Sequence, residues 1–98
     1  MKVTVASPDL EFLVGGNIVT AEFPIRVIRA AKQRHDLLRA VPLFDQIPRW
    51  RSFQYERSGA RSGSIYVTEG WRMDIRGEEG NGQPDHVTIT SVRKVKND

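Results

Sequence analysis

The stretch Gly63-Ser-Ile-Tyr-Val-Thr-Glu-Gly-Trp-Arg-Met-Asp-Ile-Arg76 decides the fold of this chain. Its apolar and polar side chains alternate on both sides of a turn at Glu69-Gly70. One face is apolar and carries Ile65, Val67, Trp71, Met73 and Ile75. The other face is polar and carries Tyr66, Arg72, Asp74 and Arg76. Alternation of period two is typical of a sheet with one buried and one solvated face. We therefore predict a β-hairpin and look for function on its polar face.

A helix is predicted for residues 24–41, because Pro24 marks its start and Pro42 its end. One half of the helical wheel carries the apolar side chains of Val27, Ile28, Ala30, Ala31, Leu37, Leu38 and Val41. Arg34 interrupts this stripe, so its stem is expected to lie on the core while its head reaches water. The alternative is that the stripe faces a groove or a partner. His35 is expected to be a half-buried helix residue rather than a ligand or base.

The other segments complete a single domain over residues 1–98. Alternation predicts strands at 1–6 and 86–92, and partial alternation predicts another at 49–56. Ser7-Pro8-Asp9 is a helix-start signal for a short element that ends at Gly15-Gly16. Residues 42–48 are a connector with a short hydrophobic cluster, and 57–63 and 77–85 are predicted loops. We predict an α+β fold with a small antiparallel sheet of three to five strands, covered on one face by N-terminal helices.

Composition narrows the classes of function. The chain of 98 residues has no cysteine, which rules out thiolate chemistry. No apolar run approaches the roughly 20 residues of a membrane span, so a soluble cytoplasmic protein is expected. Residues 26–61 hold nine basic residues against three acidic ones, whereas residues 69–85 hold two against five. Eleven of the fifteen basic residues are arginine, which binds phosphate through two nitrogens, so a polyanion such as nucleic acid is the predicted partner.

Common catalytic motifs are absent from the sequence. The glycines at 77, 80 and 82 stand among acidic residues that would repel phosphate. The two histidines are far apart and no serine sits in a nucleophile elbow, so neither a metal site nor another cofactor is predicted. What remains is the polar face, where Tyr66 and Arg72 are joined at the rim by Arg57, Arg61, Arg93 and Lys94. Arginines beside an aromatic ring suit phosphate contact and base stacking in RNA.

The order of these features resembles the RelE/ParE toxin superfamily of bacterial toxin–antitoxin systems, and within it the HigB-like plasmid-maintenance killer proteins. The resemblance spans residues 24–94 and rests on three motifs: Phe23-Pro24 at the helix start, the hairpin with its Gly70-Trp71-Arg72 triplet, and the final strand Val87-Thr-Ile-Thr-Ser-Val-Arg-Lys94. It implies a RelE-like fold and a metal-independent endoribonuclease that cleaves mRNA, usually in the ribosomal A site. It also implies a cognate antitoxin, often a helix-turn-helix protein.

The resemblance also implies roles for site residues. Arg72, which follows the hairpin aromatic, matches the family's active-site and phosphate-binding arginine. Basic residues on the preceding loop and strand contact RNA in the family, which implies this role for Arg57 and Arg61. Residues at the end of the last strand complete the site, which implies RNA binding for Arg93 and catalysis for Lys94.

The chain departs from the family at the groups that transfer protons. RelE-like members carry lysines where this chain has Ser64 and Tyr66, and HigB-like members often have Asp-Tyr-His where it has Ser91-Val92-Arg93. Tyr66 or Tyr55 is the candidate replacement. Two other functions stay open: a ParE-like fold that inhibits DNA gyrase without nuclease activity, and a non-catalytic module that binds nucleic acid or protein. A purely structural role for Arg72, paired with an acid or a neighbouring strand, also stays open.

Overall fold

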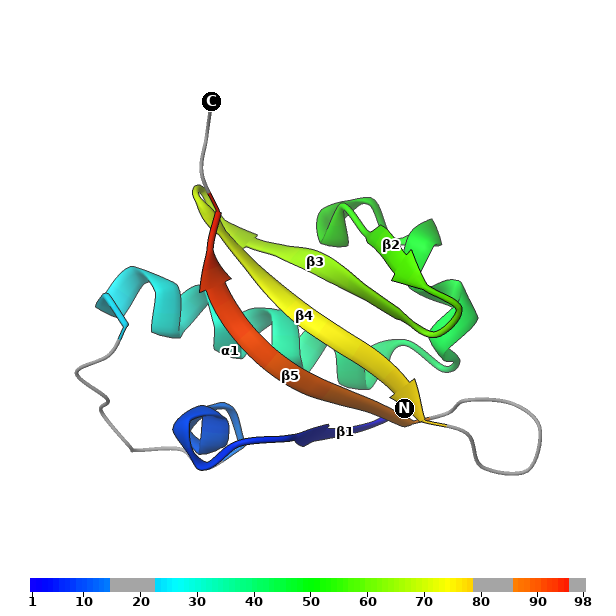
Figure 1. Ribbon diagram of the computed structural model, residues 1–98, viewed down its shortest axis with the longest axis horizontal. Helices are drawn as coiled ribbons and strands as arrows, with labels where there is room; N and C mark the ends of the chain where they lie inside the picture. The colour runs from blue at the N-terminus through cyan, green and yellow to red at the C-terminus, as the bar shows by residue number, and fades with distance from the viewer. Residues whose placement is uncertain (15–22, 79–85, 96–98) are drawn as a thin grey trace.

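The fold is built on one five-stranded sheet with the strand order β1-β5-β4-β3-β2 (Figure 1). The computed structural model describes residues 1–14, 23–78 and 86–95. The strands are β1 (Lys2–Val5), β2 (Glu56–Gly59), β3 (Ser62–Thr68), β4 (Trp71–Glu78) and β5 (His86–Lys94). The predicted α+β class is confirmed. The prediction of a wholly antiparallel sheet is wrong at one edge, because β1 runs parallel to β5.

The predicted hairpin is confirmed as β3 and β4. Its buried face carries Ile65, Val67, Met73 and Ile75, each at most 1% exposed. The strands are joined through Glu69 and Gly70, and Gly70 has a φ of 81°, a conformation that favours glycine. The polar residues of the hairpin therefore lie on the opposite face, as the alternation predicts.

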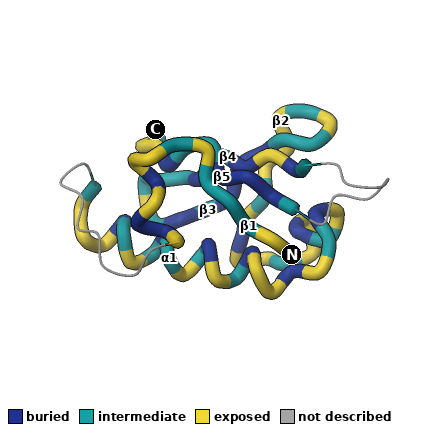
Figure 2. The backbone as a smooth tube through the Cα atoms, turned by 90° about the horizontal axis from the view of Figure 1, so that it is seen from below, coloured by how far each residue is buried: buried dark blue, intermediate teal, exposed yellow. Residues whose placement is uncertain are grey.

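Helix α1 (Ile25–Ala40) covers the apolar face of the sheet and turns its exposed residues outward (Figures 1 and 2). Val27, Ala31 and Leu38 on the predicted stripe are all 0% exposed. The short 3₁₀ segment η1 (Pro8–Leu13) begins at Ser7, whose hydroxyl accepts a hydrogen bond from the backbone N–H of Asp9 at 3.3 Å. The predicted end of this element, at residues 15–16, lies outside the described residues. In the part of the chain that the structure describes, no helix is long and apolar enough to cross a membrane.

Two polar residues of α1 make contacts that differ from expectation. Arg34 is partly exposed, and its head also donates from Nε to the carbonyl oxygen of Tyr66 at 2.9 Å, a contact that the sequence did not predict. This oxygen lies on β3 beyond Ser64, the last residue that β2 pairs with, so Arg34 caps an open sheet edge. His35 is more buried than predicted, at 4% exposure, and its Nδ1 lies 3.1 Å from a carboxylate oxygen of Asp36.

The prediction of a strand at residues 49–56 is wrong. The chain forms two 3₁₀ segments there, η2 (Phe44–Arg49) and η3 (Arg51–Phe53), and only Glu56 enters a strand. Trp50 and Phe53 stand three residues apart, so a 3₁₀ turn places both rings on one side, where they stack with centroids 5.8 Å apart. Packing of two large rings at period three outweighs a weak alternation of period two.

The prediction of a loop at residues 57–63 is wrong as well. The segment is a second hairpin, in which Glu56 pairs with Ser64 and Arg57 pairs with Gly63. The Tyr55 ring packs against Gly63 so closely that a Cβ there would lie 2.6 Å from two ring carbons. Glycine at position 63 is therefore needed for packing, where sequence analysis assigned it to a loop.

A β-bulge in β5 changes which of its side chains reach the polar face. Ile75 pairs with Ile89, but the preceding residue Asp74 pairs with Ser91, so Thr90 is the extra residue. Beyond the bulge the alternation is shifted by one position, and Arg93 faces the polar side. The predicted strand at 86–92 is confirmed and extends through residue 94, whereas most of the predicted loop at 77–85 lies outside the described residues.

Candidate functional site

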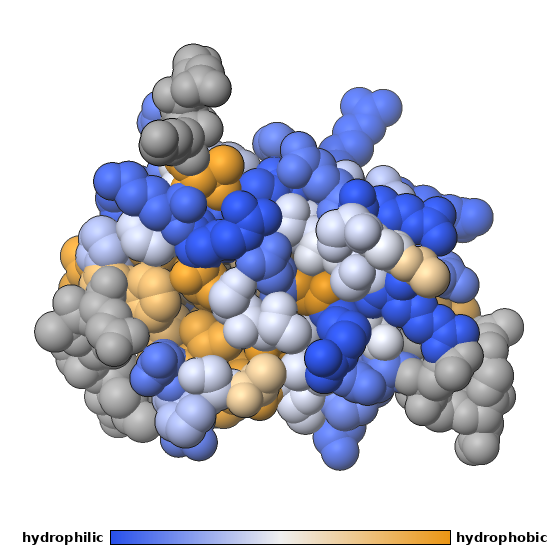
Figure 3. Space-filling view, viewed as in Figure 1, coloured by the Kyte–Doolittle hydropathy of each residue, from blue (hydrophilic) through white to orange (hydrophobic). Residues whose placement is uncertain are grey.

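Three of the predicted site residues lie in one row across the polar face. In the strand register Tyr66 on β3 is opposite Arg72 on β4, and Arg72 is opposite Arg93 on β5. Opposed residues of antiparallel strands have Cα atoms about 4.5–5.5 Å apart, so the three side chains leave the sheet next to one another. Hydrophilic side chains gather in the upper and right-hand parts of this view, beside an apolar patch at the lower left (Figure 3). The bulge in β5 is what brings Arg93 into the row.

Arg72 is anchored on this face by three hydrogen bonds. Its Nε donates to the Ser64 hydroxyl at 2.8 Å, and its Nη2 donates to the carbonyl oxygens of Gln54 at 2.6 Å and Ser64 at 3.0 Å. The side chain is 12% exposed, and a carboxylate oxygen of Glu56 lies 3.6 Å from Nε. Nη1 has no hydrogen-bond partner among the described residues. The guanidinium group is therefore fixed in place beside Glu56.

A cleft of about 270 Å³ opens beside Arg72. It is lined by Gln54, Glu56, Tyr66, Thr68, Gly70, Trp71, Arg72 and Val95. Glu56 is a carboxylate that sequence analysis missed, and its side chain is 72% exposed. Because residues 57–63 were predicted to be a loop, the pairing of Glu56 with Ser64 across them was not expected. The signal that points to it is the small-residue run Ser58-Gly59-Ala60, which ends in the turn between the two strands.

Tyr66 is held at the open edge of β3 by Arg34. Besides the hydrogen bond to the Tyr66 carbonyl, the guanidinium carbon of Arg34 lies 5.7 Å from the centroid of the Tyr66 ring. A cation at this distance attracts the ring face by about 0.5–1 kcal/mol at an exposed site. The ring also lines the cleft, where an aromatic surface can stack on a base.

Asp74 connects Arg93 to the centre of the face. Its Oδ2 accepts hydrogen bonds from Arg93 Nε, at 2.8 Å, and from the Ser91 hydroxyl. The hydrogen bond that Arg93 donates to the Asp74 carboxylate raises the pKa of Arg93, which favours its charged form. The Arg93 side chain is 49% exposed and stands opposite Arg72 in the strand register, although it is not among the residues that line the cleft.

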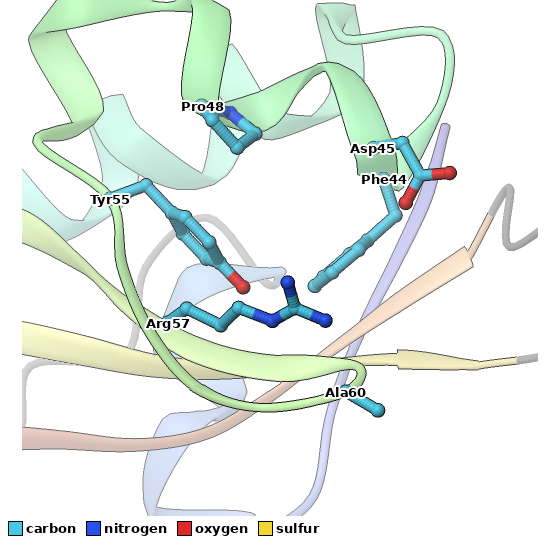
Figure 4. Close-up of a pocket in the computed structure, with 6 residues that line it drawn as sticks. All are labelled: Phe44, Asp45, Pro48, Tyr55, Arg57 and Ala60. Atoms are coloured by element: carbon cyan, nitrogen blue, oxygen red, sulfur yellow. The ribbon is translucent and has the colours of Figure 1, made fainter.

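The other three predicted site residues lie away from this row. Arg57 faces the side of the sheet opposite Glu56, and it lines a second pocket of about 200 Å³ together with Phe44, Asp45, Pro48, Tyr55 and Ala60 (Figure 4). Arg61 lies in the turn between β2 and β3, where its carbonyl oxygen accepts from the N–H of Gly77 at 2.7 Å. Lys94 is opposite Trp71, so it leaves the exposed end of β5 on the other face from Arg93.

Tyr55, the second tyrosine considered for proton transfer, belongs to this second pocket. Its hydroxyl donates to the carbonyl oxygen of Ser62 at 3.2 Å, and its ring meets Phe44 edge-on with centroids 6.3 Å apart. Burial raises the pKa of Tyr55, and the nearby charge of Arg57 opposes this only in part. The phenol of Tyr55 is therefore kept neutral and outside the cleft, which leaves Tyr66 as the tyrosine of the candidate site.

The carboxylate of Glu78 gives the polar face a pH-sensitive contact. Hydrogen bonds from Arg76, at 2.9 and 3.0 Å, and from the Thr88 hydroxyl, at 3.1 Å, lower the pKa of Glu78. A carboxyl group with a lowered folded-state pKa stabilises the fold above its unfolded pKa of about 4.3, and this stabilisation is lost as the pH falls through the folded value.

We therefore expect Glu78→Gln to lower the unfolding temperature at pH 7, and to lower it progressively less as the pH falls below about 4.3. Thermal unfolding followed by circular dichroism from pH 7 to pH 2.5 measures this difference. Glu11→Gln, at an exposed position in η1, is the matched control and should show no such convergence. A Glu78→Gln difference that stays constant over the whole range would contradict the assignment.

Comparison with known proteins gives no further assignment. No family model, curated protein or solved structure matches this chain. Within residues 1–14, 23–78 and 86–95, no three His, Asp or Glu side chains gather closely enough to hold a metal ion. The candidate site is therefore interpreted from its own geometry.

Proposed function

We propose that this chain is the toxin of a type II toxin–antitoxin system with a RelE/HigB-like fold, and that it cleaves mRNA on the ribosome as a metal-independent endoribonuclease. The observation that carries the proposal is an anchored Arg72 that shares one cleft with Tyr66 and Glu56. A guanidinium group that is already fixed needs no reorganisation to meet the negative charge that develops on a phosphate during cleavage. The resemblance over residues 24–94 supplies the biological setting.

The cleft residues suit cleavage by the 2′-hydroxyl of the RNA itself. The 2′ oxygen forms a bond to the adjacent phosphorus while the bond to the 5′ oxygen breaks, which yields a 2′,3′-cyclic phosphate and a 5′-hydroxyl. The carboxylate of Glu56 accepts the proton of the 2′-hydroxyl, and the phenol of Tyr66 donates a proton to the leaving oxygen. Arg72 and Arg93 stabilise the charge on the phosphate oxygens between these two events.

The proposal includes partners and a location. The substrate is mRNA in the ribosome, and the toxin is neutralised by a cognate antitoxin, a helix-turn-helix protein. Both ribosomes and mRNA belong to the cytoplasm. The excess of basic residues in 26–61 supports contact with a polyanion, since positive charge attracts phosphate from a distance and speeds encounter.

The test is induced expression in bacteria of the wild type and an Arg72→Gln variant, with mapping of mRNA 5′ ends. The wild type is expected to stop growth and to produce 5′-hydroxyl ends at positions in phase with codons. The variant should lose both effects, because glutamine cannot supply the positive charge. Arg49→Gln, at an exposed position on η2, is the control and should keep both.

Two results would overturn the proposal. Growth arrest with intact mRNA and with DNA-damage signalling would identify a gyrase-directed toxin instead. Normal growth with soluble, folded wild-type protein would favour a non-catalytic binding module. Circular dichroism of the purified variants shows whether a lost effect reflects lost folding.

A further inference from the structure

Arg76 is an exposed arginine on the polar face that the cleavage step does not use. It follows Arg72 by four residues on β4, so both side chains leave the same face. Its side chain is 55% exposed, and its Nε and Nη2 both donate to one carboxylate oxygen of Glu78. As at Arg72, Nη1 has no hydrogen-bond partner in the described part of the chain. Two arginines of one strand are thus each held through Nε and Nη2.

The spacing of the two arginines matches an extended nucleic-acid strand. Four residues of a β-strand span about 13 Å. A single strand that follows a protein groove covers this distance in about two nucleotides. Phosphates two nucleotides apart can therefore reach Arg72 and Arg76 at the same time.

The side chains between the two arginines are small or have their charge paired. Asp74 lies midway, is 29% exposed, and has its charge paired with Arg93 at 2.8 Å. The neighbouring strand β3 places only serines beside this part of β4, with Ser62 opposite Arg76 and Ser64 opposite Asp74. Small side chains leave room for a sugar–phosphate backbone, and a paired carboxylate repels a phosphate less than a free one does.

We propose that Arg76 forms a second phosphate subsite, two nucleotides from the phosphate held at Arg72, and that RNA lies along β4 as an extended single strand. The inference rests on the proposed function for the identity of the ligand. It adds a requirement of its own, since the RNA must extend at least two nucleotides from the cut on the Arg76 side.

The test uses RNA 12-mers in which all 2′-hydroxyls except one are methylated, so that only one cleavage position exists. A neutral methylphosphonate replaces a single phosphate, two or four nucleotides from that position on either side. Binding is measured by fluorescence anisotropy on fully methylated, uncleavable versions. Cleavage is measured on the others, both free and in programmed ribosomes.

For the wild type, the neutral group two nucleotides away on one side is expected to weaken binding about tenfold, and the group four nucleotides away less than twofold. Arg76→Ala should weaken binding of the unmodified RNA by a similar factor and should remove the effect of the neutral group. Arg29→Ala, at an exposed position on α1, is the control for the loss of one distant positive charge: it should weaken binding less than twofold and should keep the effect of the neutral group.

Glu78→Gln separates phosphate binding from a structural role of Arg76. It removes the carboxylate partner and keeps the guanidinium, so RNA binding should be retained. If Glu78→Gln weakens binding as much as Arg76→Ala does, or if the neutral group still acts in Arg76→Ala, the subsite is wrong. RNA that binds with the expected pattern but is not cleaved would contradict the proposed function alone. Cleavage that is indifferent to every neutral group would contradict the subsite alone.

Discussion

Replacing Arg72 by lysine is expected to lower the rate of RNA cleavage by roughly 100- to 1,000-fold, the range seen when one preorganised donor to a developing negative charge is removed. Lysine keeps the positive charge, but its ammonium group cannot bond the Ser64 hydroxyl, the Ser64 carbonyl and the Gln54 carbonyl while it also faces a phosphate. The loss should appear in kcat. KM for RNA should change less, because Arg93 also contributes to RNA binding. Single-turnover cleavage of a defined RNA measures it.

The same substitution has a structural cost that the experiment must separate. The Arg72 side chain is only 12% exposed, so its replacement leaves carbonyl oxygens without their charged donor. This loss is expected to lower the unfolding free energy by about 1–3 kcal/mol. Urea unfolding measures this cost, and cleavage is compared only under conditions where both proteins are folded. Arg49→Lys is the matched control and should change neither quantity. A folded Arg72→Lys variant with wild-type kcat would show that Arg72 serves the fold alone.

Phe53→Ala is expected to lower the unfolding free energy by about 3–5 kcal/mol, which is the usual cost of removing a buried aromatic ring. Phe53 is 0% exposed, and its ring stacks on Trp50 at an angle of 29°. Its loss leaves a cavity under the segment that presents the Gln54 carbonyl to Arg72. Urea or thermal unfolding measures the change.

Ser52→Ala tests the same segment without touching the core. Ser52 is the exposed residue between Arg51 and Phe53 in η3, so its replacement should change the unfolding free energy by less than about 0.5 kcal/mol. A strand at 49–56 would bury alternate residues and would make position 53 no more sensitive than 51. Arg51→Ala is therefore measured as well, and equal losses of unfolding free energy in Arg51→Ala and Phe53→Ala would contradict the 3₁₀ packing.

Parts of the site with local signals were predictable from the sequence. The place of Tyr66 and Arg72 on the polar face follows from alternation within one hairpin, which needs no distant contact. The helix between two prolines was equally predictable, because its apolar stripe and both ends are encoded within residues 24–41. Both predictions for residues 49–63, a strand followed by a loop, were wrong. The aromatic packing and the short second hairpin of this segment depend on the surface against which they pack.

The contacts that orient the site were beyond sequence reasoning. Arg72 bonds the Gln54 carbonyl from 18 positions away, and Gln54 takes a left-handed φ of 43°, unusual for a residue with a side chain. Arg34 reaches Tyr66 from 32 positions away and caps a strand edge that exists only because β2 is short. No periodicity or motif reports such pairings.

The sequence by itself determined the hairpin and which side chains of each strand are buried, because period two depends only on the order of apolar and polar residues. The register shift between Tyr66 and Thr68, which sets Tyr66 opposite Arg72, was decided by the tertiary structure. The tertiary structure decided which basic residue of the last strand joins that row. Without the extra residue at Thr90, alternation from Val87 and Ile89 would place Arg93 on the core side and Lys94 on the polar side. The bulge reverses them. A bulge arises from pairing between two strands, so the order of residues in one of them cannot reveal it.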